Sequence, residues 1–525
     1  MTQVHGGEKK HNDEKLKYVD IQYVEDTGGD VEEGPVAGSS GRLDPEVAKY
    51  AANEVIEIDE ETNRRLRRLI DRRILPVMVV TYFLQSLDKG TLSFSSIMDM
   101  PQDTGLVGQQ YSWLTTCIYL AVLVVEYPIN WLIQRLPLAK FFAFNICAWS
   151  LVLAFHALCH NFLGLIIVRT LLGAFEASCQ PILMFMSSMW YKRSEQPMIV
   201  TLWFMMNGFQ QIVGGLLAYG FSHIGRDGPI LSWQALFLTY GCFTFMWGIY
   251  VLLFTPDSPM RAKCYSEEDK KLMIERVRSN QTGLQNKKFR IEQFYEALKD
   301  PQCWSYAAVN FLTALPNSGI GAFANLIISG FGFTVLQTQL LAMVLGAYMM
   351  FCLLTSTYLA NRYGHTTLIM MAFVVPSIVG TIVLMIVSNT NTATQAGLLI
   401  CYYLVVSFWG AQTLSLSLLT RNVGGQTKKS VATAMNFIFW AAGNAIGPQL
   451  FRSQDAPRYF LAFAVHIGCY VVLIIWLILL RFYFIYQNKK KARYLEEHRE
   501  AMDQKGIHSF DDLTDLQNPN FVYSY

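Results

Sequence analysis

The stretch VRTLLGAFEASCQPILMFMSSMWY (Val168–Tyr191) overlaps an apolar run from 163 to 190 that carries only two charged residues, Arg169 and Glu176. A hydrocarbon core about 30 Å thick is crossed by a helix of about 20 mostly apolar residues. This run is therefore long enough to span a membrane. Similar runs recur, and we expect twelve spans, at 75–98, 112–134, 138–158, 163–190, 198–221, 232–254, 304–328, 335–359, 366–387, 395–420, 431–451 and 460–486.

The composition also indicates an integral membrane protein. Of the 525 residues, 52% are apolar and 16% are charged, whereas soluble domains carry about 25% charged residues. A net charge of +2 argues against nucleic acid as a partner. The sequence shows no nucleophile with a base, no phosphate-binding loop and no metal-ligand cluster, so we expect neither an enzyme nor a bound cofactor.

Lysine and arginine predict the orientation, because short cytosolic loops are enriched in them. Six arginines precede the first span: Arg64, Arg65, Arg67, Arg68, Arg72 and Arg73. The loops expected in the cytosol carry Arg135, Lys140, Lys192, Arg193, Arg362, Arg421, Lys428 and Lys429, and those expected outside carry Arg226, Arg452 and Arg458. We therefore expect both termini in the cytosol.

A long polar stretch divides the spans into two sets of six. The predicted organisation is a cytosolic, largely disordered region at 1–73, a six-helix bundle at 74–254, a cytosolic linker at 255–303, a second six-helix bundle at 304–486 and a cytosolic tail at 487–525. In the linker, Ser266 and Asp269 predict a capped helix start, and Ile291, Phe294 and Leu298 form a helical stripe. After residue 491 we expect a short solvated helix and an extended end.

Five charged residues fall inside the first set of spans, namely Asp88, Lys89, Glu126, Arg169 and Glu176. A charge at the centre of a membrane helix costs about 2.5–3.5 kcal/mol on insertion scales, so such residues face a bundle interior, a partner or water. Arg169 and Glu176 are two helical turns apart and share one face, about 10 Å from each other. The second set offers amides instead, of which we expect Gln412 and Asn436 to contact substrate.

The charges favour coupled binding of a proton and an anion. Asp88 and Glu176 balance Lys89 and Arg169 when both acids are ionised, and protonation of both acids leaves two cations that favour an anion. The alternative is a structural ion-pair network between spans 1 and 4. For Glu126 the alternative is a bond to backbone groups that Pro128 leaves unpaired.

The predicted span 7 contains LPNSGIGAFANLIISGFGF (Leu315–Phe333), with one proline, four glycines and two asparagines. Discontinuous helices rich in glycine and proline mark substrate sites in transporters. We therefore expect a broken helix here, with Pro316 and Asn317, like Glu126, as candidates for gating or a secondary role. The alternative is a kink packed against a neighbouring helix.

Several motifs resemble the major facilitator superfamily, and within it the fungal anion:cation symporters of the allantoate, nicotinate and vitamin permease group. They are LDKGTLSFSS (Leu87–Ser96), YPINWLIQRLPLAKF (Tyr127–Phe141), the quoted stretch Val168–Tyr191, NVGGQTKKSVATAMNFIFWAAGNAIGPQLF (Asn422–Phe451) and FDDLTDLQNPNF (Phe510–Phe521). The resemblance implies the major facilitator fold, with Asp88 and Glu176 as protonation sites and Lys89 and Arg169 as carboxylate-binding residues. Lys89 stands where relatives often have arginine, and lysine lacks the bidentate fork.

These observations predict a proton-coupled transporter that imports a small organic anion, such as allantoate or nicotinate, by alternating access. The proton gradient would supply the driving force, and we expect a monomer in the fungal plasma membrane. One alternative is an efflux carrier of the same fold that exports a carboxylated metabolite. A second is a nutrient sensor without transport, which would need a larger cytosolic domain than the linker provides.

Overall fold

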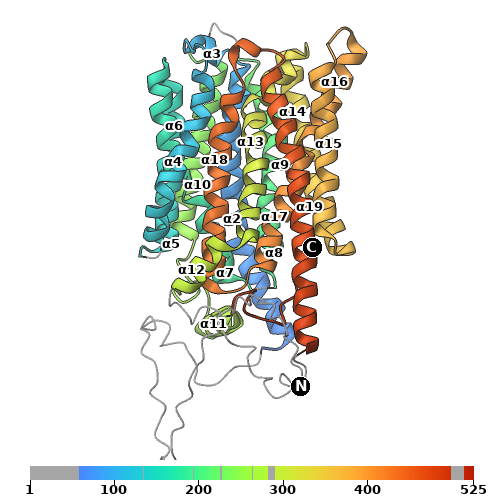
Figure 1. Cartoon of the computed structure of the whole chain (residues 1–525). Helices are drawn as coiled ribbons and strands as arrows, with labels where there is room; N and C mark the ends of the chain where they lie inside the picture. The colour runs from blue at the N-terminus through green and yellow to red at the C-terminus, as the bar shows by residue number, and fades with distance from the viewer. Residues whose placement is uncertain are drawn as a thin grey trace, which may run out of the picture. The chain divides into compact units, whose positions relative to one another are not determined.

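The computed structural model describes residues 58–133, 135–192, 194–224, 228–262, 264–281, 290–497 and 513–525. The chain divides into two compact units, Met1–Lys49 and Tyr50–Tyr525, and every described residue belongs to the second. The disorder predicted for most of 1–73, and the loop residues Arg193 and Arg226, lie outside the described residues. Helices make up nearly all of the described chain, which contains no strand (Figure 1).

The first half of the chain contains nine α-helices and one 3-10 turn among its described residues. They are α2 (Glu60–Ser96), α3 (Met100–Asp103), α4 (Gln110–Ile133), α5 (Leu138–Phe155), η1 (His156–Leu158), α6 (Phe162–Glu176), α7 (Cys179–Trp190), α8 (Gln196–Phe204), α9 (Met206–Phe221) and α10 (Ser232–Phe254). The linker contains α11 (Glu267–Gln281) and α12 (Ile291–Lys299).

The second half contains α13 (Pro301–Gly330), α14 (Val335–Tyr363), α15 (Thr366–Ile386), α16 (Thr392–Val405), η2 (Val406–Phe408), α17 (Trp409–Asn422), α18 (Gln426–Ile446), η3 (Gly447–Leu450), η4 (Ser453–Asp455) and α19 (Phe460–Glu497). Nine helical segments of the described chain are long and apolar enough to cross a membrane. The other three predicted spans fall on α2, on α8 with α9, and on α18. They are not among the nine apolar segments because these helices begin with polar residues or are interrupted, as α8 and α9 are at Met205.

The predicted break in span 7 is wrong, because α13 runs without interruption from Pro301 to Gly330 with Pro316 inside it. At least one of its glycines serves packing instead. A Cβ added at Gly319 would lie 2.6 Å from the Phe451 ring and 3.1 Å from the Gly447 carbonyl oxygen. Glycine there lets α13 approach η3 closely.

Span 4, by contrast, is interrupted, because α6 ends at Glu176 and α7 begins only at Cys179. Pro181 lacks the N–H that would bond the Ala177 carbonyl, which favours a break one turn earlier. The side-chain amide of Gln85 on α2 donates to the Glu176 carbonyl over 3.1 Å. The interruption therefore lies beside one of the predicted proton-coupling residues.

The two halves meet along α4 with α18, α9 with α14, and α2 with α13. We call the end of the bundle with α11, α12 and the start of α2 the linker side, and the end with α3 and the start of α4 the far side (Figure 1). On the far side, the Tyr111 hydroxyl donates to the Ala322 carbonyl and the Thr116 hydroxyl to the Ala445 carbonyl, both over 2.8 Å. These bonds hold the halves together at that end.

Both linker segments are helical. The Ser266 hydroxyl accepts from the Asp269 N–H over 3.1 Å, as the capping pattern predicts. On α12 the polar face packs inward, because Gln293 Oε1 accepts from the backbone N–H of Thr427 at 3.0 Å and so caps the start of α18. The predicted apolar stripe consequently faces outward, with Ile291 50% exposed.

The predicted solvated helix after residue 491 and the predicted non-helical end are both present, but the end packs against the bundle. Helix α19 continues to Glu497, and residues 513–525 pack against the linker side of the second half. Their anchor is Asp515, whose side chain is fully buried and accepts from Gln302 Nε2 at 3.0 Å and from the Tyr523 hydroxyl at 2.8 Å. Burial and the Asp515 carboxylate raise the pKa of the Tyr523 phenol, which therefore remains a proton donor.

The buried Lys428 at the start of α18 connects the tail to the linker. Its ammonium nitrogen lies 2.9 Å from Glu296 Oε1, 2.6 Å from Asp300 Oδ2 and 2.8 Å from Asp515 Oδ1. These carboxylates come from α12, from the residue that caps α13, and from the tail. We call Lys428 with these three acids the clasp. Lys428, which the sequence predicts to lie in a cytosolic loop, is thus enclosed by carboxylates.

Candidate functional site

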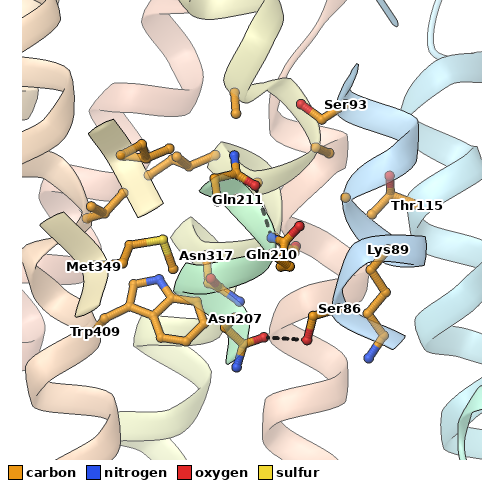
Figure 2. A pocket seen from close by; sticks show the side chains of 18 of the residues that line it. Ser86, Lys89, Ser93, Thr115, Asn207, Gln210, Gln211, Asn317, Met349 and Trp409 are labelled. Carbon is orange, nitrogen blue, oxygen red and sulfur yellow. Dashed lines mark hydrogen bonds between the residues drawn. The ribbon is translucent and has the colours of Figure 1, made fainter. Parts of the chain in front are cut away.

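A cavity of about 180 Å³ lies between the two halves of the chain. Figure 2 shows Ser86 and Lys89 of α2 on one side of it, and Met349 of α14 and Trp409 of α17 on the other. Among the described residues that line the cavity, Lys89 is the only charged one. The cavity therefore presents one cation within a largely neutral surface.

Amides and a serine form the polar part of the cavity. The Ser86 hydroxyl donates to Asn207 Oδ1 over 3.2 Å, and Asn207 Nδ2 donates to the Tyr82 hydroxyl over 3.0 Å. Gln210 Nε2 donates to Gln211 Oε1 over 3.0 Å (Figure 2). Buried and half-buried amides held in a network keep fixed directions, so they are suited to recognise a polar solute.

Lys89 links this cavity to a predicted protonation site. Its ammonium nitrogen lies 4.0 Å from Glu176 Oε2, and its side chain is 37% exposed while that of Glu176 is 1% exposed. Both residues also line a second cavity of about 20 Å³, together with Glu126 and Tyr119. Of the predicted site residues, Lys89, Glu176 and Glu126 are thus brought together around one small space.

Asp88 lies in the packed interior of the first half. Its side chain is fully buried, and the Trp149 indole N–H of α5 donates to Asp88 Oδ2 over 3.0 Å. Asp88 is not among the described residues that line the larger cavity. Consecutive residues point about 100° apart on a helix, so α2 can present Lys89 to the cavity and Asp88 to α5.

Arg169 is also fully buried, on α6. Its guanidinium carbon lies 5.6 Å from the centre of the Phe237 ring, and within the described chain its three nitrogen atoms have no hydrogen-bond partner. A Cβ at Gly173, between Arg169 and Glu176, would lie 2.7 Å from the Ile118 carbonyl oxygen. The close approach that Gly173 permits is therefore that of α4.

The remaining predicted site residues lie in the second half. Gln412 Nε2 donates to Asn310 Oδ1 over 3.2 Å, and Asn310 Nδ2 donates to the Asn436 carbonyl over 3.3 Å, which joins α17, α13 and α18. Asn317 lines the larger cavity, whereas Pro316 is buried in α13. Gln412 and Asn436 are not among the described residues that line that cavity.

The sequence analysis missed the amides of α9, because it searched the spans of the first half for charges. Asn207, Gln210 and Gln211 belong to the run NGFQQ within an otherwise apolar span. Positions three and four apart lie on one face of a helix. That spacing is the signal that would have found them.

The fold and the central cavity between two halves define a membrane transporter. The profile of the Major Facilitator Superfamily matches residues 78–448, so the chain belongs to this superfamily. The chain is 31% identical over 506 residues to the allantoate permease of Saccharomyces cerevisiae, covering 94% of this chain and 92% of that one. It is 34% identical over 466 residues to the thiamine pathway transporter THI73 of the same yeast, covering 89% and 87% of the two chains.

A solved structure supports the fold. The inward-facing, unoccupied form of a bacterial homologue of the human lysosomal transporter Spinster matches 77% of this chain and 94% of its own, with a TM-score of 0.56 and 16% identity. Together with the superfamily match, this confirms the major facilitator fold. The relatives also confirm the expectation of a transporter rather than an enzyme.

Proposed function

We propose that the protein is a proton-coupled importer of a small organic anion, and that Lys89 is shared between Glu176 and the carboxylate of the substrate. The observation that carries the proposal is the position of Lys89, which lines the central cavity and lies 4.0 Å from Glu176. One relative is named as an allantoate permease and another as a thiamine pathway transporter. The first of these names favours a carboxylate-bearing nutrient such as allantoate, and nicotinate carries the same group.

The charge of the cavity would depend on the proton. While Glu176 is ionised, it neutralises Lys89, and the attraction between unit charges 4 Å apart is about 4 kcal/mol at an effective dielectric constant of 20. Protonation of Glu176 removes that attraction and leaves Lys89 free to bind an anion. A bound anion in turn competes for Lys89 and so favours protonated Glu176. This reciprocal effect is the linkage that a symporter requires.

The dimensions support a small substrate. A volume of about 180 Å³ lies below the range of about 300–1,000 Å³ found for sites of drug-sized ligands. The apolar residues Met349 and Trp409 opposite Lys89 favour a solute with a flat or apolar body. The amides Asn207 and Gln210 would then bond its polar groups.

The access side follows from the contacts between the halves and from the charged loops. The hydrogen bonds at Tyr111 and Thr116 join the halves on the far side, and the distribution of lysine and arginine favours a cytosolic linker side. We infer that this arrangement is the state in which the cavity opens to the cytosol. A multi-pass location in the fungal plasma membrane fits this function.

The test is uptake of radiolabelled carboxylates into right-side-out membrane vesicles. We expect accumulation when the outside is acidic and loss of accumulation when a protonophore collapses the gradient. Glu176→Gln should retain counterflow exchange but fail to accumulate substrate. Accumulation by Glu176→Gln at the level of the parent would refute the coupling role of Glu176, and transport driven only outward would favour the efflux alternative.

A further inference from the structure

The smaller cavity lies between α2, α4, α18 and the interruption of span 4. It has a volume of about 20 Å³, and its polar lining consists of Gln85, Lys89, Tyr119, Glu126, Glu176 and Gln180. A space of about 10–15 Å³ or more with two to four polar partners is sufficient for one water molecule. This cavity meets both conditions.

Two carboxylates border this space, and they differ in their access to solvent. Glu176 is 1% exposed, and within the described chain neither of its oxygen atoms has a hydrogen-bond partner. Glu126 Oε2 is buried and likewise has no partner among the described residues, while Glu126 Oε1 accepts from the exposed Asn130 side chain over 3.1 Å. Glu126 therefore reaches from the small cavity toward the surface.

The structural alternative for Glu126 fails for the ionised carboxylate. Pro128 removes an N–H from the helix, and the group left without a partner is the carbonyl of residue 124. A carbonyl is an acceptor, and an ionised carboxylate has no hydrogen to donate. Glu126 in its charged form therefore cannot satisfy the backbone group that Pro128 leaves free.

We propose that Glu126 is a proton-relay residue, which exchanges protons with Glu176 through one water molecule in the small cavity. Protonated Glu176 gives its proton to the water, and the water gives a different proton to ionised Glu126. Glu176 is then ionised and pairs again with Lys89, and Glu126 releases its proton to water near Asn130. The total charge around the cavity does not change during the transfer.

This inference rests on the proposed function, because it requires Glu176 to carry the coupled proton. It adds the route by which that proton leaves. Lys89 borders both cavities, so release of the substrate anion and recovery of the Lys89–Glu176 pair occur at the same place. The relay would let the two events follow each other without a separate opening to water at Glu176.

The test compares Glu126→Gln with Glu176→Gln in membrane vesicles, by counterflow, by gradient-driven uptake and by proton flux that accompanies the substrate. Counterflow should persist in Glu126→Gln, because exchange of loaded carriers needs no proton release. Since a positioned proton-transfer group contributes about 100-fold or more, we expect gradient-driven uptake and proton flux to fall by about that factor. Glu126→Asp, which keeps a titratable group, should recover part of both.

The control is Glu497→Gln, which removes an exposed carboxylate at the end of α19 that lines neither cavity, and it should retain coupled uptake. Normal coupling in Glu126→Gln together with uncoupling in Glu176→Gln would overturn the relay while the proposed function stands. Equal loss of counterflow and uptake in both Glu126→Gln and Glu126→Asp would also overturn it. Normal coupling in Glu176→Gln would instead refute the proposed function.

Discussion

Replacement of Lys428 by methionine tests whether the clasp holds the linker side together. Lys428 is fully buried, and so are the side chains of Asp300 and Asp515 beside it. Methionine has a similar length but no charge, so Lys428→Met would leave these acids and Glu296 facing one another without their shared cation. The exposed Lys490, on the last turns of α19, offers a matched substitution.

The expected loss follows from this burial. Removal of one partner of a buried ion pair costs about 3–5 kcal/mol, because it leaves an uncompensated charge. At roughly 2–4 °C per kcal/mol for a unit of about 200 residues, the melting temperature should fall by about 6–20 °C. An exposed substitution such as Lys490→Met should change stability by about 0.5 kcal/mol or less.

Thermal unfolding of the purified, detergent-solubilised protein measures the difference. The triple substitution Lys428→Met, Asp300→Asn and Asp515→Asn should recover most of the loss, because it removes the two fully buried carboxylate charges together with the lysine. Deletion of residues 513–525 should also lower the melting temperature. If Lys428→Met melts at the same temperature as Lys490→Met, the clasp does not stabilise the protein and the argument is wrong.

Three further substitutions test the interior of the first half. Arg169→Gln should abolish transport while surface labelling shows normal delivery to the membrane, and normal uptake of a carboxylate would contradict a role for this buried cation. Lys89→Arg should retain more uptake than Lys89→Ala, because charge at the cavity matters more than shape, whereas equal losses would argue against a counter-charge role. Trp149→Phe should cost about 1–3 kcal/mol by removing the N–H that bonds Asp88, measured by thermal unfolding against Trp247→Phe, which loses only a neutral bond to Thr81.

Local patterns in the sequence were sufficient to predict the features that depend on residues close to one another in the chain. Apolar runs predict helices because each run must satisfy its own backbone in lipid, and the Ser266–Asp269 pattern predicts the start of α11 because a cap needs only residues one turn apart. The charged residues also point to the site. A charge inside an apolar run is costly wherever it lies, so Lys89 and Glu176 stand out without knowledge of the fold.

Features that depend on which helices become neighbours required the tertiary structure. Asp88 and Lys89 are adjacent in the sequence, yet only the packing of α2 against α5 decides that Asp88 bonds Trp149 while Lys89 lines the cavity. The same holds for Gly319, which lies within the continuous α13 and leaves space for the Phe451 ring.

The sequence by itself therefore determined that this protein is a helical membrane protein with ionic groups in its first half, because lipid penalises every exposed polar group in the same way. Only the tertiary structure decided what those groups bind. Lys428 shows the difference most clearly. The sequence predicts that it lies in a loop, but the structure encloses it between Asp300 and Asp515, which lie far from it in the chain. Its partners depend on the packing of α12, α13 and the tail against the start of α18, and no local sequence pattern predicts that packing.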